Sequence, residues 1–288
     1  MRRAVFSSSD GRIRGLAAQA EAAPIALMRR AAASLFNTVF PSDCRLCGAP
    51  LTNISRLPVC GLCLASVRPM EGELCLICSE RLFTFGDQPP AGDQRICGLC
   101  RHARPPYQRA VAYGEYSGEL RELLHLLKYE SMQPAAAFLG GLLAQAIGQL
   151  PLNGQYLLVP VPLHRERLRQ RGFNQAELLA RAAQRCLGAR CRVDAGILRR
   201  ARATDSQTGL TRHQRRANVR GAFRVTRPAV ADQTIVVIDD VFTTGITASE
   251  CARVLMRAGA KQVFVATVAR VLKGEVARPI QSIAAASA

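Results

Sequence analysis

The chain has 288 residues, enough for one large or two modest domains with a substantial hydrophobic core. Apolar residues make up 49% of it, a composition that is typical of globular proteins and argues against a disordered chain. The net charge of +18 and the isoelectric point near 10.4 predict polyanionic partners or substrates, namely nucleic acid, anionic lipid or a polyphosphate; a solvated basic surface is the alternative.

The N-terminal residues and the longest uncharged stretch bear on location. Residues 1–23 are rich in Arg and Ala without an uninterrupted apolar core, so they predict a disordered leader and not a secretory signal. Residues 24–40 repeat apolar side chains at helical spacing, which predicts an amphipathic helix that packs on the rest of the protein; a membrane-surface role is the alternative. Polar residues, glycines and a proline interrupt the uncharged residues 131–163, so we predict no membrane span. We expect a soluble, cytoplasmic protein.

Eight of the eleven cysteines form four C-x-x-C pairs, which predicts a double zinc-finger-like module over residues 41–104. Two thiolates at this spacing can bind one side of a tetrahedral Zn²⁺, so two pairs complete a site. Sequential and interleaved pairing both satisfy the spacing. Because all ligands would be thiolates with no open position, the predicted zinc is structural, and its ligands are Cys44, Cys47, Cys60, Cys63, Cys75, Cys78, Cys97 and Cys100. The remaining cysteines are expected to be core thiols: Cys186, Cys191 and Cys251.

Residues 105–270 alternate strand-like and helix-like patterns, which predicts a second, larger domain. A short strand at 109–113 precedes a helix that starts near Ser117. His125 and Lys128 lie beside the apolar stripe of this helix. Such residues are more often solvated than catalytic, so a substrate role for them is only an alternative.

A β-like run at 156–161 is followed by an unusually basic segment. Four arginines fall within seven residues from Arg165, before a glycine turn and a helix that starts near Gln175. Guanidinium groups bind phosphate oxygens bidentately, so this segment predicts a polyphosphate-binding loop. Between Leu157 and Arg224 the chain carries sixteen arginines and four acids, and the polar stretch TDSQTGLT within this region predicts a mobile lid.

The most informative stretch is VVIDDVFTTGIT, residues 236–247. Its apolar start predicts a buried parallel strand, with Asp239 and Asp240 at the carboxyl end, where open α/β sheets bind ligands. A helix is predicted to start at Thr247, with Glu250 completing a capping box. Helix N-termini favour phosphate, whereas carboxylates suit ribose hydroxyls or Mg²⁺. The pattern therefore predicts a sugar-phosphate site.

This stretch has two other interpretations. One is a core strand that ends in a solvated turn. The other is a nucleotide site, but neither G-x-x-x-x-G-K-[ST] nor G-x-G-x-x-G occurs in the chain. Beyond the motif, residues 263–269 predict a last core strand, Arg270 is expected to begin a frayed end, and residues 271–288 predict a disordered tail.

Six features carry a resemblance to a known family: the cysteine pairs, LLHLLKY, VPVPLH, RLRQRGFNQAELLA, QTGLTRHQRRANVRGAF and VVIDDVFTTGIT, in this order from Cys44 to Arg270. The last resembles the signature of type I phosphoribosyltransferases for phosphoribosyl pyrophosphate (PRPP). The set resembles the ComF family (competence protein F, GntX-like). The resemblance implies an α/β fold, a type I phosphoribosyltransferase-like parallel sheet flanked by helices with a small N-terminal cysteine-rich zinc module. It also implies an association with DNA uptake or transformation.

By this resemblance the catalytic residues would be Asp239 and Asp240, which would hold the ribose diol of PRPP with Mg²⁺. The 5′-phosphate would bind Thr243, Thr244, Gly245, Ile246 and Thr247. Pyrophosphate would lie against Pro162, Leu163, His164 and Arg165, and residues 199–210 would belong to a flexible loop. The implied enzyme is a phosphoribosyltransferase whose acceptor no residue identifies. The alternative is a non-catalytic PRPP sensor or a single-stranded-DNA-binding module of the competence machinery, with DNA or DNA-uptake proteins as partners.

Overall fold

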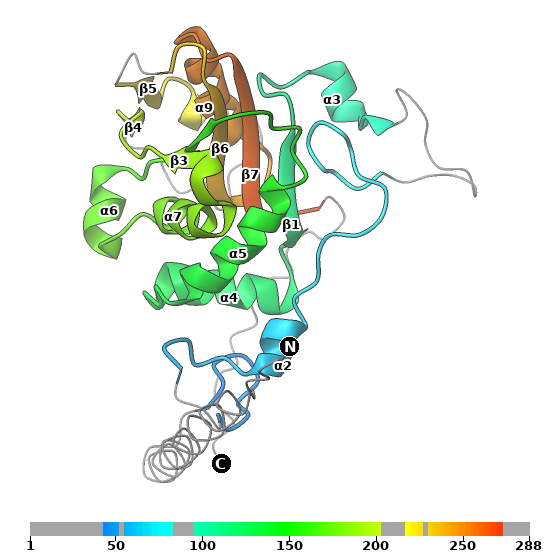
Figure 1. Ribbon diagram of the computed structural model, residues 1–288, viewed down its shortest axis with the longest axis vertical. Helices are drawn as coiled ribbons and strands as arrows, with labels where there is room; N and C mark the ends of the chain where they lie inside the picture. The colour runs from blue at the N-terminus through cyan, green and yellow to red at the C-terminus, as the bar shows by residue number, and fades with distance from the viewer. Residues whose placement is uncertain (1–42, 52–54, 83–94, 203–216, 227–229, 273–288) are drawn as a thin grey trace, which may run out of the picture. The chain divides into compact units, whose positions relative to one another are not determined.

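The computed structural model describes residues 43–51, 55–82, 95–202, 217–226 and 230–272 (Figure 1). The predicted leader, the helix at 24–40 and the tail from residue 273 lie outside these ranges. The chain divides into two compact units, Met1–Leu64 and Ala65–Ala288. None of the helices in the described ranges combines the length and the apolar character that a bilayer crossing needs.

The smaller unit is described from Asp43. A β-bridge between Asp43 and Pro50 closes the turn that carries Cys44 and Cys47. The short helix α2 (Gly61–Ala65) begins directly after Cys60.

The larger unit is built on a five-stranded parallel sheet with the strand order β1-β7-β6-β2-β3. The strands are β1 (Ala110–Glu115), β2 (Tyr156–Pro160), β3 (Cys191–Val193), β6 (Thr234–Phe242) and β7 (Gln262–Arg270). The central strands are apolar and buried almost throughout, because helices cover both faces of a parallel sheet. The predicted parallel α/β sheet flanked by helices is confirmed.

Helices lie on both sides of this sheet (Figure 1). One face is covered by α5 (Ala135–Ile147) and α7 (Gln175–Leu187), with α4 (Gly118–Tyr129) packed against α5. The other face carries α9 (Ile246–Arg257). The remaining described elements are α3 (Gly98–His102), α6 (Arg165–Arg171), the 3₁₀ turn η2 (Gly188–Arg190) and an antiparallel pair, β4 (Leu198–Arg200) with β5 (Phe223–Val225).

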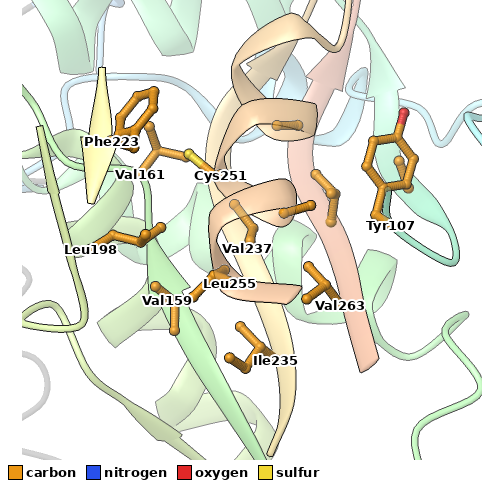
Figure 2. Packing of buried hydrophobic residues seen from close by; sticks show 14 of the residues in the cluster. Tyr107, Val159, Val161, Leu198, Phe223, Ile235, Val237, Cys251, Leu255 and Val263 are labelled. Carbon is orange, nitrogen blue, oxygen red and sulfur yellow. The ribbon is translucent and has the colours of Figure 1, made fainter. Parts of the chain in front are cut away.

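The core on the α9 side forms because alternate strand residues point to the same face. Cys251 and Leu255 of α9 lie over Val159, Val237 and Val263, which come from three adjacent strands (Figure 2). Fully burying an aliphatic side chain of this size contributes about 1.5–3 kcal/mol. This core anchors α9 at the carboxyl end of β6, where the predicted site lies.

Two expectations about individual residues are wrong. Arg270 does not begin a frayed end: it is the last residue of β7, it is 3% exposed, and it pairs with Glu115 of β1 on one side and Phe242 of β6 on the other. Cys186 is exposed on α7 because it falls off the apolar face of that helix, whereas Cys191 and Cys251 are buried as expected.

Candidate functional site

The predicted phosphate loop links β6 to α9. Thr243, Thr244 and Gly245 connect the two elements, and α9 begins at Ile246 with Gly245 as its N-cap in a left-handed conformation (φ 72°). A β-carbon on Gly245 would lie 2.5 Å from Cζ of Phe242, so both the backbone angle and the space require glycine here. The backbone N–H groups at the start of α9 therefore follow the loop directly, as an anion site requires.

The predicted capping box is wrong. The helix starts before Thr247, which places this residue in the first turn of α9. Glu250 accepts a hydrogen bond from the backbone N–H of Gly221 at 2.7 Å and forms an ion pair with Arg253. Glu250 therefore fastens α9 to the segment that precedes β5.

Asp239 and Asp240 occupy successive positions near the end of β6, so their side chains leave opposite faces of the sheet. Asp240 is 5% exposed and forms an ion pair with Lys128 of α4, on the side of the sheet where α4 and α5 pack. Asp239 is half-buried, and its Oδ1 accepts a hydrogen bond from the backbone N–H of Asp240 at 2.9 Å.

Two partly buried cations, Lys128 and Arg200, influence the titration of Asp239. Burial raises the pKa of Asp239 to about 6, while the positive charges of Lys128 and Arg200 oppose this rise. Burial likewise lowers the pKa of Lys128 to about 8, against the attraction of Asp239. The pKa of Arg200 is lowered by burial and by the nearby charge of Arg167, and raised by that of Asp239. The free site thus holds two acids whose charge is offset by side chains from α4 and β4.

The predicted pyrophosphate loop leaves the sheet beside the acid pair. β2 runs parallel to β6 with Pro160 opposite Ile238, and the backbone N–H of Val161 donates to the carbonyl of Ile238 at 2.9 Å. The loop that follows, Pro162 to His164, therefore starts next to Asp239, and the Nδ2 of Asn174 braces it through a 3.0 Å hydrogen bond to the carbonyl of Val161.

The arginines of the basic segment form α6, a helix with no buried residue. Arg171 at its end lies over the ring of Tyr129, 5.7 Å from Cζ to the ring centroid, and donates to Oε1 of Gln175 at 2.7 Å. Its charge is close enough to lower the pKa of Lys128. The exposed Arg165, Arg167 and Arg169 are thus presented to solvent from a helix that begins at the loop after β2.

The eight predicted metal ligands fall into two groups that follow the sequential pairing. The first is Cys44, Cys47, Cys60 and Cys63, and the second is Cys75, Cys78, Cys97 and Cys100; within each group the four sulfurs lie within 4.8 Å of one another. Sulfur–sulfur distances of 3.9 Å for Cys44–Cys63 and 3.7 Å for Cys78–Cys97 match the spacing of about 3.8 Å expected around a tetrahedral Zn²⁺ with 2.3 Å bonds. The thiols present therefore fit such an ion.

The two clusters share one local design. In each, the residue after the second cysteine is left-handed, Gly48 (φ 72°) in the first and Ser79 (φ 55°) in the second, and its backbone N–H donates to the carbonyl of the first cysteine at 2.8 Å. The second pair begins a short helix, α2 or α3. The environments differ, because Cys75, Cys78 and Cys100 belong to the core of the larger unit.

Sequence reasoning missed or undervalued three residues near these sites: Lys128, Arg200 and Arg270. Lys128 was predicted to be solvated, but its ammonium group contacts Asp240. Its position beside the apolar stripe of α4 was the available signal. His125 on the same helix contacts the hydroxyl of Tyr116, 3.0 Å from Nε2, and not the acids. In the predicted flexible loop, residues 203–210 lie outside the described ranges.

These features define an α/β protein with a five-stranded parallel sheet, a strand–loop–helix unit with two acids near the end of its strand, and two tetracysteine clusters. No family model matches the chain. It is 36% identical over 239 residues to DNA utilization protein YhgH of Salmonella typhi, covering 81% of this chain and 98% of that protein. It is 28% identical over 222 residues to Competence protein F of Haemophilus influenzae, covering 73% and 96%. The chain therefore belongs to the ComF-like family, which includes YhgH.

A solved structure shows a weak structural similarity to this chain. The allosteric regulatory enzyme of purine biosynthesis aligns with 47% of this chain and 26% of its own length, at 21% identity and a TM-score of 0.32.

Proposed function

We propose that this protein binds PRPP together with Mg²⁺ at the carboxyl end of β6 and acts as a phosphoribosyltransferase-type protein associated with DNA uptake. The observation that supports it best is the placement of Asp239 and Asp240 one loop before the N-terminus of α9. Its relatives' names, DNA utilization protein and competence protein, support the link to DNA.

Each part of the site has a chemical task in this proposal. The carboxylates of Asp239 and Asp240 accept hydrogen bonds from the ribose diol or bind Mg²⁺, which would neutralise part of the pyrophosphate charge. The backbone N–H groups from Thr243 to Thr247 hold the 5′-phosphate. Residues 162–165 and the arginines of α6 bind the departing pyrophosphate, which stabilises a transition state with charge separation at C1 of the ribose.

Lys128 acts in this proposal as the internal counter-ion of the free site. A buried carboxylate without a partner costs several kcal/mol, and the ion pair with Lys128 offsets that cost for Asp240 before ligand binds. Asp239 and Asp240 would hold the ribose diol and Mg²⁺, which would supply positive charge for the pyrophosphate. Lys128 would then be available to contact the phosphates.

The eight clustered cysteines bind two structural zinc ions in this proposal. Thiolate zinc sites persist where cysteines stay reduced, which supports a cytoplasmic location. Structural zinc contributes folding free energy directly, because a thiol-rich segment buries little apolar surface by itself.

A second candidate function is a non-catalytic module that senses PRPP or binds single-stranded DNA. It is favoured by the exposed arginines of α6 and by the sixteen arginines between Leu157 and Arg224. Because phosphate contacts would dominate, affinity for an oligothymidylate should fall steeply with salt, with a slope that the triple change Arg165→Gln, Arg167→Gln and Arg169→Gln reduces. DNA affinity that is independent of salt would contradict this candidate.

Calorimetric titration with PRPP and MgCl₂ tests the proposed site. The wild-type protein should bind, and Asp239→Asn with Asp240→Asn should weaken binding at least about a hundredfold, because charge-assisted hydrogen bonds contribute about 1.5–3 kcal/mol each. Asp232→Asn, which changes an exposed acid in a turn, is the matched control and should bind like the wild type. Undiminished binding by the double variant would contradict the assignment. Pyrophosphate release with an added acceptor then separates an enzyme from a sensor.

A further inference from the structure

Arg270 lies between the second cysteine cluster and the phosphate loop. It is the last residue of β7 and is 3% exposed, which is unusual for an arginine without a dedicated role. One of its nitrogens, Nη2, donates to Oε2 of Glu80 at 2.8 Å and lies 3.8 Å from Sγ of Cys78. The guanidinium therefore touches a predicted metal ligand directly.

The same guanidinium has hydrogen-bonding capacity to spare. Nε and Nη1 of Arg270 are buried and make no hydrogen bond within the described part of the chain. Four thiolates around one Zn²⁺ carry about two net negative charges, and metal-bound thiolates are good acceptors of N–H groups. Arg270 is a buried cation with two unused donors beside Cys78. Such a group is better placed next to a negatively charged metal–thiolate cluster than next to four neutral thiols.

On its other side Arg270 contacts the residue that supports the loop. Its Cζ lies 4.6 Å from the centroid of the Phe242 ring, and Tyr107 packs edge-on against that ring at 6.4 Å. The same ring lies under Gly245, where an added β-carbon would clash at 2.5 Å. The position of Phe242 thus restricts the conformation of Gly245 and of the loop that precedes α9.

We propose that Arg270 is a positioning residue that couples the metal in the Cys75 cluster to the phosphate loop. With the metal bound, the thiolate charge holds the guanidinium, the guanidinium holds Phe242 by a cation–π contact, and the ring holds Gly245 in place. Loss of the metal removes this charge and loosens the loop. The loop half of this proposal rests on the proposed PRPP site; the metal half does not.

Zinc release to a colorimetric chelator tests the metal half. Arg270→Met should speed the release of one zinc equivalent by about tenfold or more, the effect expected when an outer-sphere partner is lost. The other equivalent, held by the Cys44 cluster in the smaller unit, is the internal reference and should leave at the wild-type rate. Arg257→Met, on an exposed arginine of α9, is the matched control. Unchanged release of both equivalents would overturn the proposal.

Binding of PRPP with MgCl₂ by the same proteins tests the loop half. Arg270→Met should weaken it by about tenfold, and Phe242→Leu, which keeps the arginine but removes the ring, should weaken it while leaving zinc release at the wild-type rate. If Arg270→Met fails to fold, Arg270→Gln, which removes the charge but keeps a polar side chain, replaces it in both assays. Faster zinc release with unchanged PRPP affinity would overturn the coupling. A wild type that binds no PRPP would instead overturn the proposed function, with the zinc result standing by itself.

Discussion

Strands β6 and β7 are parallel neighbours, and both end in buried charge. In the register of the sheet Phe242 lies opposite Arg270, and the acids of β6 lie two and three residues before that point. Arg270 has partners of its own in Glu80 and Phe242. Asp240 likewise has an ion-pair partner, Lys128 of α4, but burial raises the pKa of its neighbour Asp239 to about 6. The raised pKa means that the charge of Asp239 is held at a cost in stability, which its proposed role in ligand binding would explain, whereas Arg270 is held by an ion pair and a cation–π contact.

The largest loss of stability is expected from changing the predicted metal ligands that lie near the end of β7. Cys75→Ser with Cys78→Ser should abolish the cooperative thermal transition of the larger unit, a loss of more than about 5 kcal/mol, because zinc binding contributes to folding and these cysteines lie in its core. Thermal unfolding followed by circular dichroism measures this loss, and zinc analysis of the same samples measures the bound metal. The matched pair Cys44→Ser with Cys47→Ser should leave that transition in place; equal damage from both pairs would contradict the distinction.

Removing the cation at the end of β7 should also destabilise the protein. Arg270→Met leaves Glu80 buried without its arginine, so the free energy of unfolding should fall by about 3–5 kcal/mol in urea titrations. Adding Glu80→Gln should recover part of this loss, because the buried negative charge is then gone. If Arg270→Met alone were as stable as the wild type, Arg270 would make no contribution to the stability of the fold.

The acid at the end of β6 should behave in the opposite way. Asp239→Asn should raise the free energy of unfolding by about 1–3 kcal/mol at pH 7.5, because the folded state holds this carboxylate at a raised pKa. A raised carboxyl pKa means that stability is lost as pH rises from 3.8 to about 6, so the advantage of the variant should be complete above pH 6 and absent below pH 3.8. If Asp239→Asn were less stable than the wild type at pH 7.5, the charge of Asp239 would stabilise the fold, as the charge of Arg270 is expected to do.

The smallest expected effect is a shift in the pKa of Asp239 when Lys128 is changed. Lys128→Met removes a charge that lowers the pKa of Asp239, so that pKa should rise from about 6 by roughly one unit. Carboxyl carbon chemical shifts followed by NMR across pH 4–8 measure it, with the pH range chosen as about two units on either side of the midpoint. Lys128→Arg keeps the charge and should titrate like the wild type. An unmoved midpoint in Lys128→Met would remove Lys128 from the site.

The local chemistry of both regions was predictable from the sequence. An apolar run that ends in two acids and a glycine-bearing loop predicts a strand, the carboxyl edge of the sheet and the start of a helix within a dozen residues. The C-x-x-C pairs likewise specify knuckle turns, which the left-handed Gly48 and Ser79 complete. In these places short-range sterics and hydrogen bonds decide the structure, so a short window of sequence is enough.

The rest depends on contacts between distant segments. Lys128 reaches Asp240 across more than a hundred residues of chain, and helical periodicity alone places it on a solvated edge. Arg270 looks like the start of a tail until β1 and β6 are known to pair on either side of it. The start of α9 was misplaced for a related reason: Glu250 bonds to Gly221, a partner that no local capping pattern contains. Sequential cysteine pairing was also undecidable from spacing, since both arrangements fit it.

The measurement that tests the central claim most directly is the thermal stability of wild type and Asp239→Asn, each with and without saturating PRPP and MgCl₂. A ligand at a hundred times its dissociation constant adds about 2.7 kcal/mol to the protein that binds it. We expect the variant to be the more stable protein without ligand, and ligand to stabilise the wild type clearly more than the variant. Equal stabilisation of both proteins by PRPP would contradict this expectation.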